Sequence, residues 1–379
     1  MSKRNQIASG LAAAGLAALA AGLTFCSASA APAPPPGFVF VAGQDQLREL
    51  DALSLAARGQ WRLSGDFVAA GLDTRGRRLE LLLGGGVNAL QALPLAANGS
   101  ARMGNPVSLG LAPAGFVLDH AQVKAYVAGM TDNGGEVAQV DLARGVVTRR
   151  MSVGRNPTGV VLNAAGTLLL VGSSADASIT VAIPETLHRL RRIGLHAPPR
   201  QLVSLPFGDK AFALCGDEVA VIDARTGDLL TYLPVGPRAQ ALQLKPDGGE
   251  LYVSNAAGTV SVIDTGSNVV SGTMAAGLGA GAMTVSPDGA TLYVANADAG
   301  TISVIDLGTR SMLAVVRVGE RPTSLELGAG GEYLFAADSG SGDLAVVRTN
   351  QDPTNPNTLV TLAPAPPQVH GLVAGAQPR

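Results

Sequence analysis

The chain has 379 residues, with 27 lysines and arginines against 29 aspartates and glutamates, and a formal net charge of −2. This near balance excludes the strong basic field that is typical of nucleic-acid-binding proteins. Charged residues make up only 15% of the chain, whereas 48 glycines and 23 prolines divide it at short intervals, a composition that indicates many short strands joined by turns.

The N-terminal segment has the pattern of a secretory signal. Lys3 and Arg4 precede an apolar stretch, and small residues lead to Ala30, after which we expect cleavage. Residues 1–30 are therefore predicted to be a signal peptide that directs the protein to the periplasm, the cell surface or the medium. Two alternatives stay open: the apolar stretch is nearly long enough to be kept as a membrane anchor, and the sequence around Cys26 resembles a lipidation site. A membrane is expected as a partner only through this segment.

A proline-rich spacer, residues 31–37, follows the signal peptide. Residues 38–374 are predicted to form one domain, and residues 375–379 a short tail. Cleavage after Ala30 would remove Cys26 and leave Cys215 as the only cysteine, so no intramolecular disulfide is expected. Cys215 ends an apolar, strand-like segment, which favours a buried and unreactive thiol.

An internal repeat defines the main domain. The segment Leu251–Asn255 recurs about 41 residues later as Leu292–Asn296, in both cases after a Pro-Asp-Gly turn and before a Val-Ile-Asp strand. Each unit contains four short strands separated by turns, and the β-branched residues of the third strand favour a pleated sheet. Four antiparallel strands per repeat correspond to one blade of a β-propeller.

Weaker copies of the second strand extend the repeat over nearly the whole mature chain, which predicts an all-β propeller of eight four-stranded antiparallel blades, with seven as the alternative. These copies lie at Phe38–Val41, Leu79–Leu83, Val123–Val127, Leu168–Val171, Ala211–Leu214, Leu251–Ser254, Leu292–Ala295 and Tyr333–Ala336. The first copy lacks a preceding strand, and the C-terminal segment Pro367–Val373 resembles one. We therefore expect the C-terminal strand to pair with the N-terminal blade, which closes the ring and hides both sheet edges.

The Leu-Tyr-Val-x-Asn segments at Leu251 and Leu292, with their Pro-Asp-Gly turns and Val-Ile-Asp strands, resemble the YVTN family of β-propeller repeats. The resemblance implies the propeller fold. Similar propellers include lactonases and the propeller subunits of periplasmic amine dehydrogenases, so the resemblance also implies an enzyme or enzyme subunit as one possible function. None of the site residues of those proteins is matched in this sequence.

One mouth of the central channel is the expected ligand site. The connections from the fourth strand of one blade to the first strand of the next should meet there, together with the loops between second and third strands. Four connections are predicted to carry one arginine each: Arg155, Arg200, Arg238 and Arg321. If their guanidinium groups converge, they would bind a carboxylate or phosphate. The alternative is that each arginine pairs with a loop acid such as Asp176, Asp298 or Asp338 and ties adjacent blades together.

His370 is predicted to lie on the C-terminal innermost strand, where it would line the channel and could act near neutral pH; packing is the alternative role. The spacing of the histidines and the single mature cysteine give no metal-ligand pattern. No metal site, cofactor or catalytic residue is therefore predicted.

These observations favour an exported, non-catalytic binding or scaffold protein that uses its channel mouth or blade rims. Its partner is predicted to be an unknown protein, a glycan or a small anionic ligand, and no nucleic acid is expected. A periplasmic enzyme or enzyme subunit is the second interpretation. Single-stranded DNA binding is the third, and it ranks last because aromatic residues make up 4% of the chain and the net charge is negative.

Overall fold

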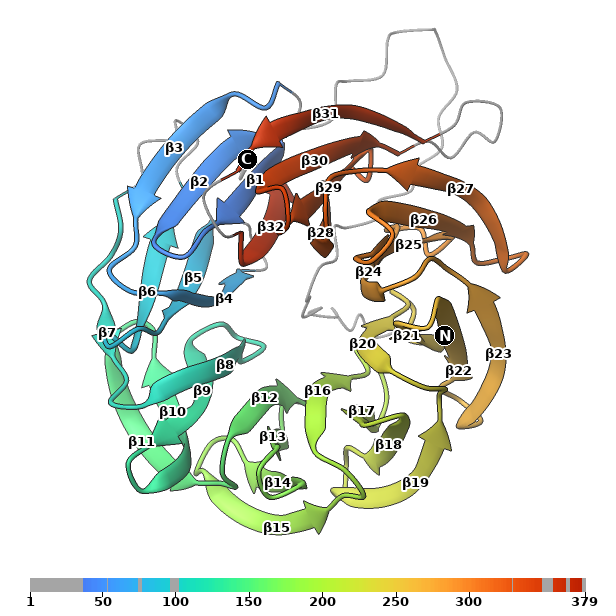
Figure 1. Cartoon of the computed structure of the whole chain (residues 1–379). Coiled ribbons are helices and arrows are strands. Elements are labelled where there is room, and N and C mark those ends of the chain that lie inside the picture. Colours follow the sequence, from blue (N-terminus) through green and yellow to red (C-terminus); the bar gives the residue numbers. More distant parts are fainter. Residues whose placement is uncertain are drawn as a thin grey trace, which may run out of the picture.

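A computed structural model describes residues 37–52, 54–73, 77–95, 102–328, 330–349, 357–365 and 369–376. In this part of the chain, 32 strands form eight four-stranded antiparallel sheets arranged around one axis (Figure 1). The expected all-β propeller with eight blades, and not seven, is confirmed. The predicted signal peptide and the spacer up to residue 36 lie outside the described residues. No described helix has the length and apolar character needed to cross a lipid bilayer.

The first four blades are formed by the N-terminal half of the chain, except that the last strand of the chain joins blade 1. From the axis outward, blade 1 contains β32 (Gly371–Ala376), β1 (Gly37–Ala42), β2 (Gln46–Asp51) and β3 (Ala57–Arg62). Blade 2 contains β4 (Phe67–Leu72), β5 (Arg78–Leu83), β6 (Ala89–Pro94) and β7 (Val107–Ser108). Blade 3 contains β8 (Ala112–Leu118), β9 (Lys124–Thr131), β10 (Gly134–Asp141) and β11 (Val146–Ser152). Blade 4 contains β12 (Pro157–Leu162), β13 (Leu169–Ser173), β14 (Ser178–Ile183) and β15 (His188–Gly194).

The other four blades follow the chain without interruption. Blade 5 contains β16 (Pro199–Ser204), β17 (Lys210–Cys215), β18 (Glu218–Asp223) and β19 (Asp228–Pro234). Blade 6 contains β20 (Ala239–Leu244), β21 (Glu250–Asn255), β22 (Thr259–Asp264) and β23 (Val269–Ala275). Blade 7 contains β24 (Ala280–Val285), β25 (Thr291–Asn296), β26 (Thr301–Asp306) and β27 (Ser311–Arg317). Blade 8 contains β28 (Pro322–Leu327), β29 (Tyr333–Asp338), β30 (Asp343–Arg348) and β31 (Thr358–Pro364).

The two ends of the propeller close the ring. β32 pairs antiparallel with β1, so that Val39 lies opposite Ala374 and Val41 opposite Leu372. The innermost strands also contact one another around the axis, including β28 with β32 and β32 with β4. The expected closing strand is confirmed in blade 1, although it spans Gly371–Ala376 and so begins later than the predicted segment.

A polar contact adds to this closure. The carboxyl group of Glu326 in β28 accepts a hydrogen bond from the backbone N–H of Ala374 in β32, and burial raises the pKa of Glu326 to about 7. The free edge of the closing strand is therefore partly satisfied by a side chain of the preceding blade.

The hydrophobic core is divided among the eight junctions between neighbouring blades, and each junction buries apolar side chains from two blades. Between blades 5 and 6, Phe212 and Val221 pack with Leu251 and Val253. Tyr252 packs instead in the junction between blades 6 and 7. Successive side chains of a strand point to opposite faces of its sheet. The alternation in the repeated Leu-Tyr-Val segment therefore supplies both neighbouring junctions.

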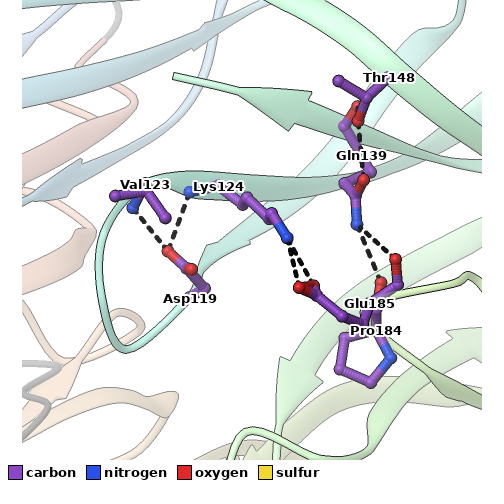
Figure 2. A network of polar contacts seen from close by, with 7 residues as sticks. All are labelled: Asp119, Val123, Lys124, Gln139, Thr148, Pro184 and Glu185. Carbon is purple, nitrogen blue, oxygen red and sulfur yellow. Dashed lines mark hydrogen bonds and ion pairs between the residues drawn. The ribbon is translucent and has the colours of Figure 1, made fainter. Parts of the chain in front are cut away.

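A polar network joins blades 3 and 4 at the end opposite the predicted mouth (Figure 2). Gln139 of β10 donates from Nε2 to the carbonyl of Pro184, 3.0 Å away, in the turn between β14 and β15, and its Oε1 accepts from the hydroxyl of Thr148 at 2.7 Å. Lys124 Nζ lies 2.7 Å from a carboxylate oxygen of Glu185. Gln139 is only 2% exposed, whereas the Glu185 side chain is 69% exposed. The buried amide therefore matters more to the junction than the ion pair.

The next three junctions are held in the same way, by one side chain that spans two blades. The Nδ2 of Asn163 donates to the carbonyl of Ala224 at 2.8 Å. Lys210 Nζ donates to the carbonyl of Gly266 at 2.9 Å. Across the junction between blades 6 and 7, Arg310 pairs with Glu250 at 2.9 Å. Each contact joins the start of a second strand, or the turn before it, to the turn between the third and fourth strands of the next blade.

We expect Gln139→Ala to lower the free energy of unfolding by about 1–3 kcal/mol, because the buried carbonyl of Pro184 loses its donor and the Thr148 hydroxyl keeps only its longer bond, of 3.2 Å, to the backbone carbonyl of residue 139. Lys124→Ala should cost less than about 1 kcal/mol, because its ion pair with Glu185 is exposed to water. Urea unfolding of both variants beside the parent protein measures the two effects. A Lys124 variant less stable than the Gln139 variant would contradict this assignment.

Truncation after residue 365 tests the closure. Loss of β32 removes Val369 and Leu372 from the junction between blades 8 and 1, and each buried side chain of this kind contributes about 1.5–3 kcal/mol. It also leaves the inner edge of β1 unpaired, which favours aggregation. We expect a lower unfolding temperature and oligomers in size-exclusion chromatography, whereas a chain ending at Ala376 should behave like the parent. A truncated monomer with unchanged unfolding temperature would show that β32 is dispensable.

Candidate functional site

Two sets of loops lie together on one face of the ring, which we call the mouth face. They are the connections from the fourth strand of one blade to the first strand of the next, and the loops between second and third strands. Hydrogen bonds join one set to the other: the N–H of Val235 donates to the carbonyl of Asp217 at 3.0 Å, that of Ala276 to the carbonyl of Gly258 at 2.8 Å and that of Val318 to the carbonyl of Gly300 at 3.1 Å. The predicted meeting of these loops is therefore observed.

A cavity of about 680 Å³ opens on the mouth face at blade 3. One wall comes from Asn88, in the loop between β5 and β6, and from the connection between blades 2 and 3. The opposite wall is the hairpin of β9 and β10. These strands have eight residues each, whereas most second and third strands have six. The end of this hairpin contributes Met130, Thr131, Asp132 and Asn133 to the lining of the cavity.

Polar and apolar side chains share the lining of the cavity. Its polar side chains are Asn88, Thr131, Asp132, Asn133, Glu136 and Arg150, and its apolar ones are Leu111, Ala112 and Met130. Two carboxylates and one guanidinium give the lining a formal charge of −1. The lining therefore offers many hydrogen-bond donors and acceptors without a net positive charge.

Arg150 is fixed in place at the edge of the cavity. Its Nη1 lies 3.4 Å from a carboxylate oxygen of Glu136, and its Nη2 donates to the backbone carbonyl of Leu109 at 2.5 Å. A side chain at Gly110 would approach Nη2 to 3.2 Å, and the φ angle of Gly110 is +63°. Glycine is therefore favoured at this turn, where its lack of a side chain leaves room for the guanidinium.

Blades 4 and 5 carry related polar groups at the equivalent position. Arg150, Arg192 and Tyr232 lie opposite Ala138, Thr180 and Ala220 of the neighbouring strands, respectively. Arg192 Nε donates to the hydroxyl of Ser178 at 2.9 Å. A row of polar groups thus crosses three adjacent blades of the mouth face.

In blade 5 this row includes a histidine. The ring of His196 stacks on Tyr232 with centroids 3.7 Å apart, and its Nδ1 lies 3.0 Å from a carboxylate oxygen of Glu218. The backbone N–H of His196 donates to the Tyr232 hydroxyl at 3.2 Å. No sequence pattern predicts this cluster, because its residues come from three separate segments of the chain.

Arg155 follows the alternative expectation. Its backbone N–H and its Nε donate to the carboxylate of Asp176 at 2.8 and 3.0 Å, and Arg192 also binds this carboxylate. These bonds, chiefly that from the Arg155 N–H, lower the pKa of Asp176 to about 2. Arg155 therefore ties the connection between blades 3 and 4 to a loop of blade 4.

The positions of Arg200 and His370 differ from the prediction. Arg200 lies within β16, as the unpaired residue of a β-bulge, because the connection before it ends at Pro198. Its guanidinium donates to the carbonyl of Ala239 at 3.2 Å and so links blades 5 and 6. His370 immediately precedes β32 and is exposed; its backbone N–H donates to the carbonyl of Ala42 at 2.8 Å.

Arg238 and Arg321 each occupy the last position of a connection and have left-handed backbones, with φ angles of +60° and +55°. Their backbone carbonyls accept hydrogen bonds from Ala256 and Ser339 at 2.9 and 3.0 Å. Both side chains are exposed and have no ion pair within the described ranges. No hydrogen bond there joins any two of the five predicted site residues, so an anion site formed by them stays a prediction.

Cys215 is 1% exposed, and burial raises the pKa of its thiol to about 12. The expected buried cysteine is therefore confirmed. Over the part of the chain that the structure describes, no group of three or more His, Cys, Asp and Glu side chains is placed to hold a metal ion.

A buried carboxylate distinguishes the loop of blade 8. In blade 7, Asn296 lies opposite Thr301 and donates from Nδ2 to the hydroxyls of Thr301 and Ser303 at 3.0 and 2.9 Å. The equivalent residue of blade 8 is Asp338, which lies opposite Asp343. Carboxylate oxygens replace both the donor and one of its acceptors at this site.

Asp338 is 0% exposed, and its Oδ1 is buried without a hydrogen-bond partner among the described residues. Its other oxygen accepts a hydrogen bond from the N–H of Gly319 at 3.0 Å. Burial, with a smaller effect of the nearby Asp343 carboxylate, raises the pKa of Asp338 to about 7.

Comparison with known proteins supports the fold. Residues 251–370 match the family model described as lactonase, 7-bladed β-propeller. The match covers less than half of the chain and falls on blades 6 to 8 of a ring that has eight. It supports a propeller and does not identify the YVTN family specifically. No curated protein matches the chain.

Solved structures show the same architecture at low sequence identity. A functionally unknown protein from Desulfotomaculum acetoxidans is 14% identical, with a TM-score of 0.61 over 89% of this chain and 99% of that chain. Hydrazine synthase of Kuenenia stuttgartiensis is 18% identical, with a TM-score of 0.58 over 76% and 96%. The β-propeller domain of Myceliophteria thermophila Cps50 (Swd1) is 15% identical, with a TM-score of 0.54 over 70% and 91%. These similarities show the fold alone.

We expect Asp338→Asn to stabilise the protein at pH 8, by at least about 1 kcal/mol, because it removes a buried acid and restores an amide donor. The pKa of Asp338 is about 7 in the folded protein, above its ordinary 3.8, so folding stability should fall as the pH rises from about 4 to about 7. The variant should lack this part of the pH dependence. Thermal unfolding at pH 4, 6 and 8 measures it.

The matched control for this prediction is Asn296→Asp in blade 7, which should destabilise the protein and add a pH dependence of the same sign. If the parent and Asp338→Asn had the same unfolding temperature at every pH, Asp338 could not be a buried acid with a raised pKa.

Proposed function

We propose that this chain is an exported, non-catalytic binding protein, and that the cavity at blade 3 holds one unit of a glycan. The lining carries the proposal: within about 680 Å³ it combines a fixed guanidinium, two carboxylates, two amides and a hydroxyl with three apolar residues. This volume lies within the range of about 300–1,000 Å³ typical of ligand sites.

A glycan suits this lining better than a small anion does. Sugar hydroxyls both donate and accept hydrogen bonds, so they can use the oxygens of Asp132 and Glu136 as well as the amides of Asn88 and Asn133. The formal charge of −1 and the Glu136 contact of Arg150 oppose a free carboxylate or phosphate. The apolar residues Leu111 and Met130 can pack against the carbon-bound face of a sugar ring.

Export to the periplasm, the cell surface or the medium remains part of the proposal, and it is supported by the apolar N-terminal segment and the small residues before Ala31. The repeats at Leu251 and Leu292 support assignment to the YVTN type. Export can be tested by expressing the chain in a bacterial host, determining where it is located and measuring by mass spectrometry whether residues 1–30 have been removed.

A lactonase-like enzyme is the second candidate, because residues 251–370 match the lactonase family model. The matched segment comprises strands of blades 6 to 8, whereas the lining of the cavity comes from residues 88–150, outside it. The two functions therefore predict different effects of substitutions at blade 3.

We expect a glycan array to identify an oligosaccharide that the purified protein binds, and Asp132→Ala combined with Asn133→Ala to weaken that binding at least about ten-fold, because two polar contacts are lost. Asp298→Ala, an exposed acid in the corresponding loop of blade 7, is the control and should leave binding unchanged. Titration calorimetry measures the affinity of the parent, the double variant and the control for this oligosaccharide.

Failure of every array glycan to bind would contradict the first candidate, as would equal binding by the blade 3 variant. Hydrolysis of a simple lactone by the parent protein, retained in the blade 3 variant, would support the second candidate instead.

A further inference from the structure

The outer strands of blades 3 and 4 form a strongly cationic rim. β11 has the sequence VVTRRMS and β15 the sequence HRLRRIG, so these two strands contain five arginines and no acidic residue. All five arginines are exposed: Arg149, Arg150, Arg189, Arg191 and Arg192. The two strands lie next to each other on the outside of the ring (Figure 1). The chain as a whole has a net charge of −2, so this rim is a positively charged surface on a slightly negative protein.

Protection of sheet edges does not account for this concentration of charge. Charged side chains on edge strands commonly prevent pairing with other chains. The outer strands β23, β27 and β31 need such protection most, because they expose apolar side chains such as Val269, Leu313 and Val360. Together they contain one arginine, Arg317, and no acid. The arginines of blades 3 and 4 therefore need another explanation.

Three of the five arginines already bind a carboxylate of the chain. Arg150 pairs with Glu136, Arg191 with Asp228 and Arg192 with Asp176. The side chains of Arg149 and Arg189 form no ion pair with any residue in the described segments. The rim therefore has two guanidinium groups available to a partner.

Arg149 occupies a carboxylate-binding position from which the carboxylate is missing. Arg149 lies opposite Gln139 in blade 3, and Arg191 lies opposite Val181 in blade 4. The two arginines therefore occupy equivalent positions in their blades. Arg191 pairs with Asp228, the first residue of β19. The first residue of β15, which corresponds to Asp228, is His188. The same position thus binds an acid in one junction and lacks the acid in the other.

We propose that the outer rim of blades 3 and 4 binds an extended acidic segment of a partner protein, whose carboxylates pair with Arg149 and Arg189. The planar guanidinium matches a carboxylate with two parallel hydrogen bonds. β11 and β15 are also the outermost strands of their sheets, so each has an unpaired edge. An extended peptide can form backbone hydrogen bonds with such an edge, whereas a polyphosphate or a lipid surface cannot.

Arg150 of this rim lines the cavity proposed to bind a glycan, but the two arginines proposed to bind the acidic segment, Arg149 and Arg189, do not. Failure of one proposal leaves the other intact. Loss of acidic-peptide binding in rim variants that keep glycan binding would distinguish the two.

Fluorescence anisotropy with a labelled ten-residue peptide of alternating glutamate and serine tests the proposal. The parent protein should bind it at low salt, and binding should weaken as salt screens the charges. Arg149→Glu combined with Arg189→Glu should weaken binding at least about ten-fold, because two attractive contacts become repulsive. Arg317→Glu, on the exposed outer strand of blade 7, is the matched control and should leave binding unchanged.

Three results would overturn the proposal. They are equal peptide binding by the parent and the double variant, equal binding of a peptide with glutamine in place of glutamate, and binding of sodium polyphosphate or phosphatidylglycerol vesicles without binding of the acidic peptide. If the double variant unfolds at the same temperature as the parent protein, its loss of binding does not reflect loss of structure.

Discussion

The pairing of β32 with β1 is the contact on which the rest of this propeller depends. It joins residues more than three hundred positions apart in the chain and places the last strand at the inside of the first blade. Without it, the junctions on both sides of blade 1 would lose their inner side chains, and the apolar residues of β1 would meet water. The carboxyl group of Glu326, which burial makes harder to ionise, accepts a further hydrogen bond across the same closure.

Closure leaves the loops free to differ, because the apolar junctions already hold the blades. Blade 3 uses this freedom in its longer hairpin, which walls the cavity. Blade 8 uses it in Asp338, a buried acid where blade 7 has an amide. The outer strands differ just as much, from the arginines of β15 to the exposed apolar residues of β27. The architecture that the blades share and the surfaces in which they differ are therefore formed by different residues.

The architecture could be predicted from the sequence because it depends on local, repeated signals. The alternation in Leu251–Asn255 reports two buried faces, and the turns after Lys245 and Ser286 mark the ends of strands. The location of the functional surfaces could not be predicted in this way. Arg200 was assigned to a connection, but a drifted repeat hid the start of β16 at Pro199. The cavity and the cationic rim combine residues whose proximity follows only from strand pairing and blade order.

Placing the core in eight equivalent junctions has an evolutionary consequence. Among the described residues, the buried apolar clusters lie between neighbouring blades, so duplication or loss of one repeat would change the circumference of the ring and preserve the kind of contact on either side of each remaining blade. A segment that matches a family of seven-bladed propellers can therefore form part of a propeller with eight blades. The number of repeats can drift among relatives while the individual repeat keeps its identity.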